Sequence, residues 1–405
     1  MAKPLRLCYV LNHGDSLMQW HKAGLFDLQL SLPRAFQGEG AEVHIVSFGG
    51  REELRLLPQL DGMKLHCNWM GLPAKTYARR IHQLHAPFLL HSHLVQTCDA
   101  AAIVVAQRIA WAWRIPLVYR FGFVLSDQRR VTPGRFTPAE LAHVEGMERM
   151  GARRAQHIIC PTRQIAQHFA GIEPAARAKT TVIPNYVDSE LFRPLPEPKQ
   201  YDLVYHGRAL EFKNLPALLE AVERLDVTIA MIAGPLPREI STEDDQLPAL
   251  KRRFGDLDGR IDWLGRIEHG QLPAYLNRAR VSIITSLSEG TARSLLEAMA
   301  CGLPCIATNV PELKYMIEHE VNGYLCETDT NSIEAAIRNV LAAPDLRRTM
   351  GEKARRGALE KYSLAPLAKR EYEVLQAVAE RHPVESAPIR IAKYLLRRNP
   401  TWARA

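Results

Sequence analysis

The sequence predicts an α/β protein of two doubly wound, Rossmann-like domains. Apolar, strand-like segments alternate with helix-like segments, and this alternation favours parallel sheets joined by helical crossovers. With 405 residues, of which 47% are hydrophobic, the chain is long enough for two domains that each bury a core. The proline-rich stretch 193–200 is the best linker candidate, because proline cannot donate to a strand ladder. We therefore expect one domain over residues 1–195 and another over 201–363.

The expected strands are short apolar runs bounded by polar or turn-forming residues. In the first half they lie at residues 5–11, 42–47, 88–91, 117–121, 157–160 and 181–183. In the second half they lie at residues 202–205, 227–233, 260–264, 281–285 and 305–307. Helices fill the gaps, among them one at 215–224 and one at 292–301, which the stop signals Gly302 and Pro304 follow.

The composition restricts the class of protein and its partners. A formal net charge of +8 favours anionic partners, but it does not choose among a nucleotide sugar, a nucleic acid and an acidic lipid surface. No nucleic-acid-binding module is visible, so we expect no nucleic-acid partner. No apolar run approaches the length of a membrane span, and the first residues show no signal-peptide cleavage pattern, so we expect a cytoplasmic protein.

The seven cysteines are scattered and odd in number, which fits a reducing compartment better than a disulfide framework. Cys301 and Cys305 have a spacing that suggests metal, but no second cysteine or histidine pair accompanies them. We favour buried thiols in these positions and expect no metal site.

The most informative segment is the turn between the strand at 281–285 and the helix at 292–301. Glu289 and Glu297 stand eight positions apart around it. The start of the helix directs unpaired N–H groups and the positive end of its dipole into the turn, which suits a phosphate. The carboxylates repel phosphate but accept hydrogen bonds from hydroxyls of a sugar or ribose. A nucleotide sugar has this layout, although an isolated pair with this spacing is more often a turn residue and a solvated helix position.

Residues 286–308 resemble the Glu-x7-Glu signature of the retaining glycosyltransferases of family four, which have the GT-B fold. The likeness includes the Leu-Glu-Ala-Met-Ala-Cys-Gly-x-Pro run. Residues 182–194 resemble the segment that closes the first domain in this family, with Tyr186 where the family usually has glycine. Residues 203–221 resemble the family's Gly-Arg and Lys-Gly segment, with Asn214 in place of the second glycine. The segments occur in the family's order.

The resemblance places Arg208 and Lys213 at positions that contact phosphate. Arg208 follows the strand at 202–205 and Lys213 precedes the helix at 215–224, so both can project from the carboxyl edge of the sheet. Ordinary surface charges are the alternative reading. The GT-B fold also implies that two domains face each other across a cleft and that a last helix, expected at 364–381, returns to the first domain, to which residues 364–405 then belong.

The resemblance implies a role for each site residue. Glu289 would hold hydroxyls of the donor sugar and Glu297 those of the ribose, while Arg208 and Lys213 neutralise the diphosphate. The remaining donor-binding candidates are Gly207, Gly290, Thr291, Ala292 and Asn185. A retaining transfer of this kind is thought to need no divalent metal, so we expect no metal and no other cofactor.

We expect the first domain to bind the acceptor, but its sequence carries weaker motifs than that of the second domain. His93, after the expected strand at 88–91, matches the family's histidine near the donor sugar, and a metal role for it lacks a third ligand. We expect Gly24 to replace the family's Gly-Gly turn. Arg120, at the end of the strand at 117–121, stands in the region where the resemblance would place a His-Gly or His-Asp turn; both residues are acceptor candidates. Arg120 could equally pair with an acidic neighbour, and Asn185 could be only a turn-forming residue.

Two departures from the family pattern leave the donor open. Residues 291–293, Thr-Ala-Arg, replace a more frequent Phe-Gly pair, and residues 309–312 lack a double glycine before Pro-Glu. Glu312 could approach the donor, or it could be a helix-start glutamate favoured by the dipole.

The C-terminal stretch 389–402 mixes basic and apolar residues. It could rest on an anionic membrane at the cytoplasmic face, where many enzymes of this family meet lipid-linked acceptors, or it could be a solvated helix that packs on the first domain.

The function expected from the sequence is transfer of a sugar from a nucleotide diphosphate donor to a hydroxyl of a saccharide or lipid-linked acceptor, as in surface polysaccharide assembly. A nucleotide-sugar epimerase of the same fold and a catalytically silent binding partner are the alternatives. A dehydrogenase is disfavoured, because no Gly-x-Gly-x-x-Gly follows the first strand.

Overall fold

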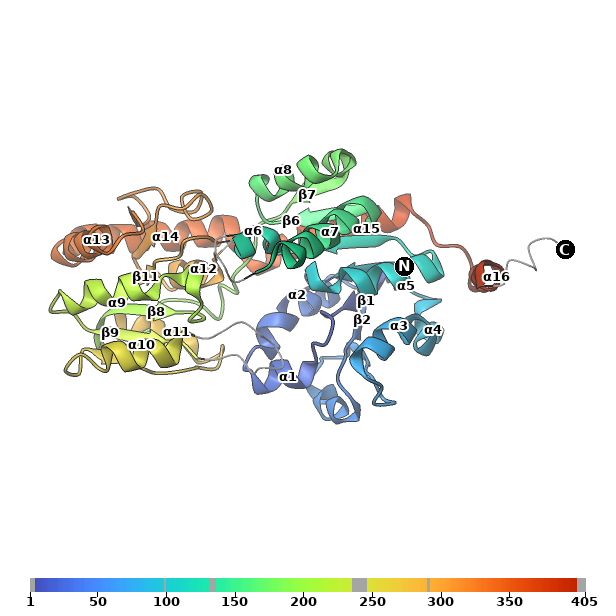
Figure 1. Cartoon of the computed structure of the whole chain (residues 1–405), viewed down its shortest axis with the longest axis horizontal. Helices are drawn as coiled ribbons and strands as arrows, with labels where there is room; N and C mark the ends of the chain where they lie inside the picture. Colours follow the sequence, from blue (N-terminus) through green and yellow to red (C-terminus); the bar gives the residue numbers. More distant parts are fainter. Residues whose placement is uncertain (1–3, 98–99, 131–135, 235–245, 290–291, 399–405) are drawn as a thin grey trace.

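The chain folds into two α/β domains that lie side by side along the longest axis of the molecule (Figure 1). The structure is a computed structural model, and it describes residues 4–97, 100–130, 136–234, 246–289 and 292–398. Each domain has a wholly parallel sheet, of seven strands in the first domain and six in the second. Together these two sheets have the two-domain architecture of the GT-B fold.

The first sheet has the order β3-β2-β1-β4-β5-β6-β7. Its strands are β1 (Arg6–Val10), β2 (Glu42–Val46), β3 (Lys64–His66), β4 (Leu94–Thr97), β5 (Leu117–Arg120), β6 (His157–Cys160) and β7 (Thr180–Val182). The central strand β1 sets the register, since Leu7 pairs with Val43 on one side and with Leu94 on the other. The five inner strands β1, β2, β4, β5 and β6 are almost wholly buried, which explains why they are largely apolar, whereas the edge strands β3 and β7 are only partly buried.

Helices cover both faces of this sheet. They are α1 (Leu17–Lys22), α2 (Phe26–Gly38), α3 (Ala74–Leu84), α4 (Ala86–Leu89), α5 (Ile103–Trp113), α6 (Leu125–Arg130), α7 (Pro138–Arg154) and α8 (Arg163–Ile172), with 3₁₀ turns η1 (Arg51–Gln59), η2 (Ala100–Ala102) and η3 (Pro174–Lys179). One apolar cluster joins Val95 and Tyr119 to Ile109 of α5, and a second joins Leu7 and Leu94 to Phe36 of α2. The domain therefore has a core on each side of its sheet.

The second sheet has the order β10-β9-β8-β11-β12-β13. Its strands are β8 (Tyr201–His206), β9 (Ile229–Ile232), β10 (Ile261–Asp262), β11 (Ala279–Ile284), β12 (Cys305–Thr308) and β13 (Tyr324–Cys326), and its helices are η4 (Glu211–Lys213), α9 (Leu215–Glu223), α10 (Leu247–Phe254), α11 (Leu272–Asn277), α12 (Arg293–Ala300), α13 (Thr330–Ala342) and α14 (Pro344–Tyr362). The chain builds one side of this sheet from β8 outward and then returns to place β11 against β8. The boundary between β8 and β11 is thus a topological switch point.

Helix α15 (Leu364–Arg381) returns the chain to the first domain, as the sequence predicts. The crossing begins beside Val187, whose N–H donates to the carbonyl of Tyr362 at 2.8 Å and whose carbonyl accepts from Leu364 at 3.0 Å. Tyr372 and Leu375 then join the core cluster that contains Phe36. A last helix, α16 (Ala387–Arg398), lies at the end of the first domain farthest from the second (Figure 1).

The strand expected at 88–91 is wrong. Residues Ala86–Leu89 form the short helix α4, which has a proline in its first turn, and the strand here is β4, which begins three residues after the end of the expected one. A short apolar run fits a buried helix as well as a strand, and Pro87 is the stronger signal because proline is favoured in the first turn of a helix. The three-residue edge strands β3 and β13 were not expected at all, since such short segments carry no periodicity.

None of the described helices is both long enough and apolar enough to cross a bilayer. The six described cysteines are buried and form no disulfide, as expected of apolar thiols, and Cys98 lies outside the described residues.

A buried ion pair fastens α15 to the first sheet. Arg120, at the end of β5, donates from Nε to both carboxylate oxygens of Glu371, at 3.0 and 3.1 Å, and only 5% and 1% of the two residues are exposed. Gln96 of β4 donates to the same carboxylate at 2.7 Å. Burial opposes the charge on Arg120, but the nearby Glu371 carboxylate raises the pKa of Arg120 above its usual value.

We expect Glu371→Ala to lower the free energy of unfolding by about 3–5 kcal/mol, because it leaves the Arg120 guanidinium buried without its anion. The thermal unfolding midpoint, measured by circular dichroism, checks this. The control is Glu373→Ala, an exposed glutamate on the same helix, which should change stability by less than about 0.5 kcal/mol. Equal effects of the two substitutions would show that the ion pair does not hold the helix.

Candidate active site

The candidate site lies at the carboxyl edge of the second sheet, where the loops after β8 and β11 meet. The two strands are neighbours, with Leu203 paired with Val281 and Val204 paired with Ser282. In open α/β sheets ligands bind at such a switch point. The loops contribute Arg208 and Lys213 from one side and Glu289 from the other.

Hydrogen bonds tie these two loops together. The Thr285 hydroxyl donates to the carbonyl of Lys213 at 3.0 Å, and the N–H of Leu287 donates to the carbonyl of Phe212 at 2.7 Å. Asn214 then turns the chain into α9 with a left-handed backbone, φ 54°. Asparagine tolerates this conformation better than most residues, which explains why it can stand where the family usually has glycine.

Lys213 and Glu289 form an ion pair across the two loops. The same Glu289 oxygen, Oε1, accepts from the hydroxyl of Ser286 at 2.7 Å. The Lys213 ammonium also lies 5.0 Å from the centre of the Phe212 ring. Both charged side chains are mostly buried, with 14% of Lys213 and 7% of Glu289 exposed, so they are held in place rather than solvated.

Two histidines hold Glu297, which lies on α12 and is 7% exposed. His206 Nε2 is 3.1 Å from one carboxylate oxygen and His269 Nε2 is 3.0 Å from the other. Burial raises the pKa of Glu297, but the hydrogen bonds and charges of the two histidines outweigh it and lower the pKa to about 2. The carboxylate is therefore ionised, and the reading of Glu297 as a solvated helix position is wrong.

The start of α12 faces the same loops. The helix begins at Arg293 with Ala292 in an extended conformation before it, and no side chain caps its first N–H groups. Those groups and the helix dipole favour an anion at this end. The expected donor-binding residues Gly290 and Thr291 lie outside the described residues.

The first domain reaches this helix through Tyr186. The guanidinium carbon of Arg293 lies 5.9 Å from the centre of the Tyr186 ring, and that of Arg120 lies at the same distance. Tyr186 is 8% exposed, and its ring lies near two cations that belong to different domains. The neighbouring Asn185 is also buried, beside Gly122.

Further contacts bring the loops of the two domains together. Gly24 has φ +57°, and a side chain there would come within 3.5 Å of the Cα atom of Glu268 in the second domain.

Gly207, in the turn after β8, has φ +153°, and a Cβ atom would lie 3.1 Å from the Tyr205 hydroxyl. That hydroxyl donates to the Arg208 carbonyl at 2.7 Å, which fixes the turn after β8.

Glu312, after β12, lies beside Glu289. Burial raises the pKa of Glu312, and the charges of Glu289 and of Asp127 in α6 of the first domain raise it further, while backbone hydrogen bonds lower it. This carboxyl group is thus close to the site, although it starts none of the described helices. The described residues contain no group of three histidine, cysteine or acidic side chains arranged to hold a metal ion.

Two of the expected first-domain residues lie elsewhere or are engaged. His93 comes before β4 rather than after a strand, and its Nδ1 accepts from the N–H of Arg6 at 3.1 Å. It is therefore at the amino edge of the first sheet, the edge opposite the site. Arg120 is at the carboxyl edge but is buried in its ion pair with Glu371. This matches the alternative in which Arg120 pairs with an acidic neighbour.

Sequence reasoning missed His206 and His269. His206 is the last residue of β8, and a histidine at the carboxyl end of a parallel strand was the available signal. His269 follows the two-residue strand β10 and carries no such signal. Ser286, whose hydroxyl donates to Glu289, lies in the motif segment, but the resemblance implies no role for it.

Comparisons with known proteins show likeness to glycosyltransferases in both halves of the chain. The model described as "Glycosyltransferase Family 4" matches residues 30–191, and the model described as "Glycosyl transferases group 1" matches residues 187–357. The chain is 32% identical to O-antigen chain mannosyltransferase B of Escherichia coli over 42% of its own length. It spans 45% of the length of that relative, and 28% and 68% of the lengths of two further curated relatives.

Solved structures share the fold, and two of them illustrate the likeness. Sucrose-phosphate synthase from Thermosynechococcus elongatus has a TM-score of 0.76 and 18% identity, with 92% of this chain and 99% of that chain covered. Anabaena HepE in complex with UDP-glucose has a TM-score of 0.71 and 19% identity, with 92% of this chain and 100% of that chain covered. At these identities the likeness establishes the fold.

The histidine contacts of Glu297 predict a stability that depends on pH in the acid range. Because the pKa of Glu297 falls from 4.5 to about 2 on folding, its contribution is complete above the unfolded value and is lost as the pH drops toward 2. The difference corresponds to roughly 3 kcal/mol at neutral pH. Glu297→Gln should therefore lower the thermal midpoint at pH 7 and approach the native protein as the pH falls below about 4.5.

Thermal unfolding of both proteins across this pH range measures the gap. Glu318→Gln, an exposed glutamate in the same domain, is the control and should leave no gap at any pH. A gap for Glu297→Gln that is constant from pH 7 to the acid limit would contradict the ionised, histidine-held carboxylate.

Proposed function

We propose that this chain, which has the GT-B fold, is a glycosyltransferase that moves a hexosyl group from a nucleotide diphosphate sugar to a hydroxyl of a saccharide or lipid-linked acceptor, with retention of anomeric configuration. The single observation that carries this proposal is the arrangement of Lys213, Glu289 and the uncapped start of α12 around one switch point. A cation, a hydroxyl acceptor and a phosphate-binding helix end lie there together.

The donor diphosphate would lie between the start of α12 and the cations of the loop after β8. Lys213, now paired with Glu289, would turn to the diphosphate, and Arg208 would add a second positive charge. Positive charge placed in advance where the leaving group becomes more negative lowers the barrier to its departure. Because these groups supply that charge, we expect the transfer to need no divalent metal and no other cofactor.

The carboxylates would orient the donor. Glu289, freed from Lys213, would accept hydrogen bonds from the sugar hydroxyls. Glu297 would accept from the ribose, since each carboxylate oxygen that a histidine occupies still has a second lone pair. His206 and His269 are then positioning residues, because they keep Glu297 ionised and fix its direction.

In the proposed reaction the acceptor oxygen approaches the anomeric carbon from the face that the diphosphate leaves. The bond from the anomeric carbon to the diphosphate oxygen breaks, the bond to the acceptor oxygen forms, and the acceptor proton passes to the departing diphosphate. Gly24 and the loops around it, which meet the second domain at Glu268, are candidate acceptor contacts.

The relatives suggest where to look for substrates. HepE binds UDP-glucose, so uridine diphosphate sugars are the first donors to test. The mannosyltransferase relative acts on an O-antigen chain, which favours an acceptor in surface polysaccharide assembly. We propose that the protein works in the cytoplasm, at the face of the membrane where such chains are built.

The experiment is a panel of uridine, guanosine and adenosine diphosphate sugars, with release of free nucleoside diphosphate as the readout. One donor class should give release, and both Glu289→Gln and Lys213→Ala should lower that rate by roughly 10²–10³-fold, the effect of removing one group that stabilises a transition state. Glu318→Ala and Lys314→Ala, exposed residues of the same domain, are the matched controls and should leave the rate unchanged.

The same assay separates the alternatives. Full activity of Glu289→Gln and Lys213→Ala would refute the proposed site. An epimerase would convert the donor sugar without any acceptor. A silent binding partner would release nothing from any donor. The anomeric coupling constant of the product, measured by NMR, decides whether the configuration is retained.

A further inference from the structure

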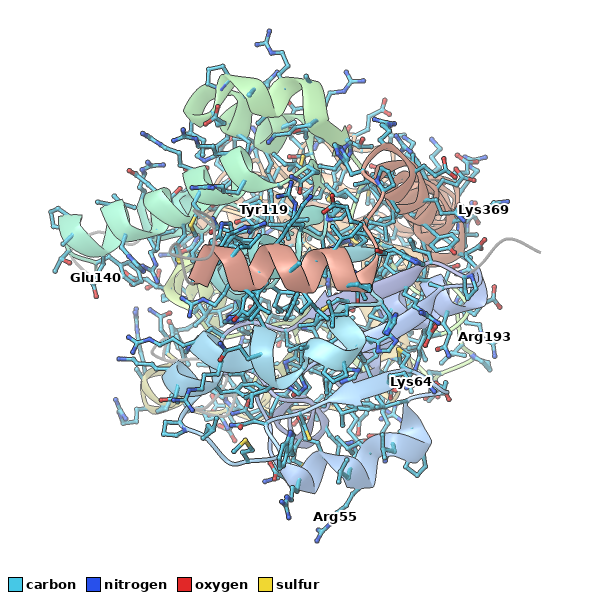
Figure 2. All side chains as sticks on the ribbon, turned by 90° about the vertical axis from the view of Figure 1, so that its right-hand side faces the viewer. Arg55, Lys64, Tyr119, Glu140, Arg193 and Lys369 are labelled. Carbon is cyan, nitrogen blue, oxygen red and sulfur yellow. The ribbon has the colours of Figure 1, made fainter. Side chains whose placement is uncertain are left out.

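Helix α16 packs on the first domain with polar side chains on its inner face and apolar side chains on its outer face. It lies lengthwise across the end of that domain, as Figure 2 shows in the centre of the view. Its inner face carries charged side chains: Arg390, which is 2% exposed, donates to the carbonyls of Leu90 and of Trp113, the latter at 3.3 Å. Arg397 donates to the carbonyl of Trp111 at 2.9 Å.

Aromatic packing adds to these anchors. Tyr394 stacks on Trp113 with 4.7 Å between ring centres, and its hydroxyl accepts from Gln83 at 2.9 Å. The helix is therefore fixed to the domain through polar and aromatic contacts.

The outer face of α16 is apolar. Ile389, Ile391, Leu395 and Leu396 are exposed by 47%, 39%, 45% and 40%. A surface helix of a globular protein usually shows the opposite arrangement, with its apolar stripe toward the core. A contiguous row of large exposed apolar side chains marks a surface that meets an apolar partner.

Arginines lie beside the C-terminal end of this helix. A cavity of about 690 Å³ opens between α16, α5 and the end of α7, and its lining includes Arg114, Arg154 and Arg397, with Glu385 as the only acidic residue among its described lining residues. The exposed Trp111 lies at this cavity, with the Arg397 guanidinium 5.3 Å from its ring centre. Apolar side chains, a tryptophan and arginines thus share one end of the molecule.

We propose that this end of the first domain binds the surface of an anionic lipid bilayer, with the outer face of α16 among the acyl chains and the arginines of the cavity against lipid phosphates. An in-plane helix binds membranes through the apolar area it buries and through attraction to anionic headgroups, and both are present here. A second copy of this chain is less suited to cover the face, because the two copies would bring their arginines together. The inference deepens the proposed function by naming the surface that would meet a membrane.

The test is co-sedimentation of the full chain with vesicles of phosphatidylcholine, with and without phosphatidylglycerol. The protein should bind only the anionic vesicles. Leu395→Glu should weaken that binding by roughly tenfold or more, because it places a charge where the helix meets the acyl chains. Arg154→Ala should weaken it roughly fivefold, the share of one basic side chain near an anionic surface.

Matched controls lie in the second domain. Leu359→Glu alters a leucine that is 39% exposed, and Arg252→Ala removes an exposed arginine from the last turn of α10. Neither should change vesicle binding. Release of nucleoside diphosphate from a soluble donor should be the same in Leu395→Glu and the native protein, which shows that the variant is folded.

Vesicle binding that Leu395→Glu and Arg154→Ala leave intact, or no binding at all, would overturn the proposal. So would a dimer in light scattering that Leu395→Glu dissociates, because a second copy would then cover the face. The binding readout needs no turnover, so failure of the transferase proposal and failure of this one are seen separately.

Discussion

The parallel pairing of β8 with β11 is the constraint on which the site depends. It brings Lys213 and Glu289 together although 76 residues separate them in the chain. The hydrogen bonds from Thr285 and Leu287 then lock one loop to the other, and β8 places His206 against Glu297 of α12. Since each of these contacts joins the β8 segment to the β11 segment, loss of the strand pairing would separate the residues of the site.

The second organising contact connects the domains. Arg120, Tyr186 and Arg293 stand where this sequence departs from the pattern of the family it resembles, and in the structure both guanidinium groups lie near the Tyr186 ring. The chain of contacts continues from Arg120 to Glu371 in the helix that returns from the second domain. These three residues, which differ from the family pattern and lie far apart in the sequence, are therefore close together in the structure. Their contacts couple the position of α12 to that of α15. An altered residue in this group acts on the relation between the domains as well as on its own contacts.

Much of the fold could be predicted because it follows from apolar runs and crossovers. β6 and α15 have the predicted bounds, and Lys213 follows β8 at the carboxyl edge of the second sheet, where the sequence places it. The ion pair between Lys213 and Glu289 was not predicted. The failures have physical causes. His93 was predicted to follow a strand, because the short apolar run at 88–91 does not distinguish a helix from a strand. The hydrogen bonds of His206 and His269 to Glu297 are tertiary contacts, which no local sequence pattern predicts.

The first sheet has two edges, and the structure uses them differently. Helix α16 lies at the amino edge, beside Leu90 and Trp113, whereas the loops that meet the second domain lie at the carboxyl edge. Strand β1 alone has five residues, which corresponds to about 17 Å between those edges. A bilayer seated on α16 would thus be separated from the reacting centre by at least that height. A single sugar on a lipid phosphate would be too short to span this distance, whereas the free end of a longer glycan would reach the site. The depth of the domain would therefore set a minimum length for a lipid-linked acceptor.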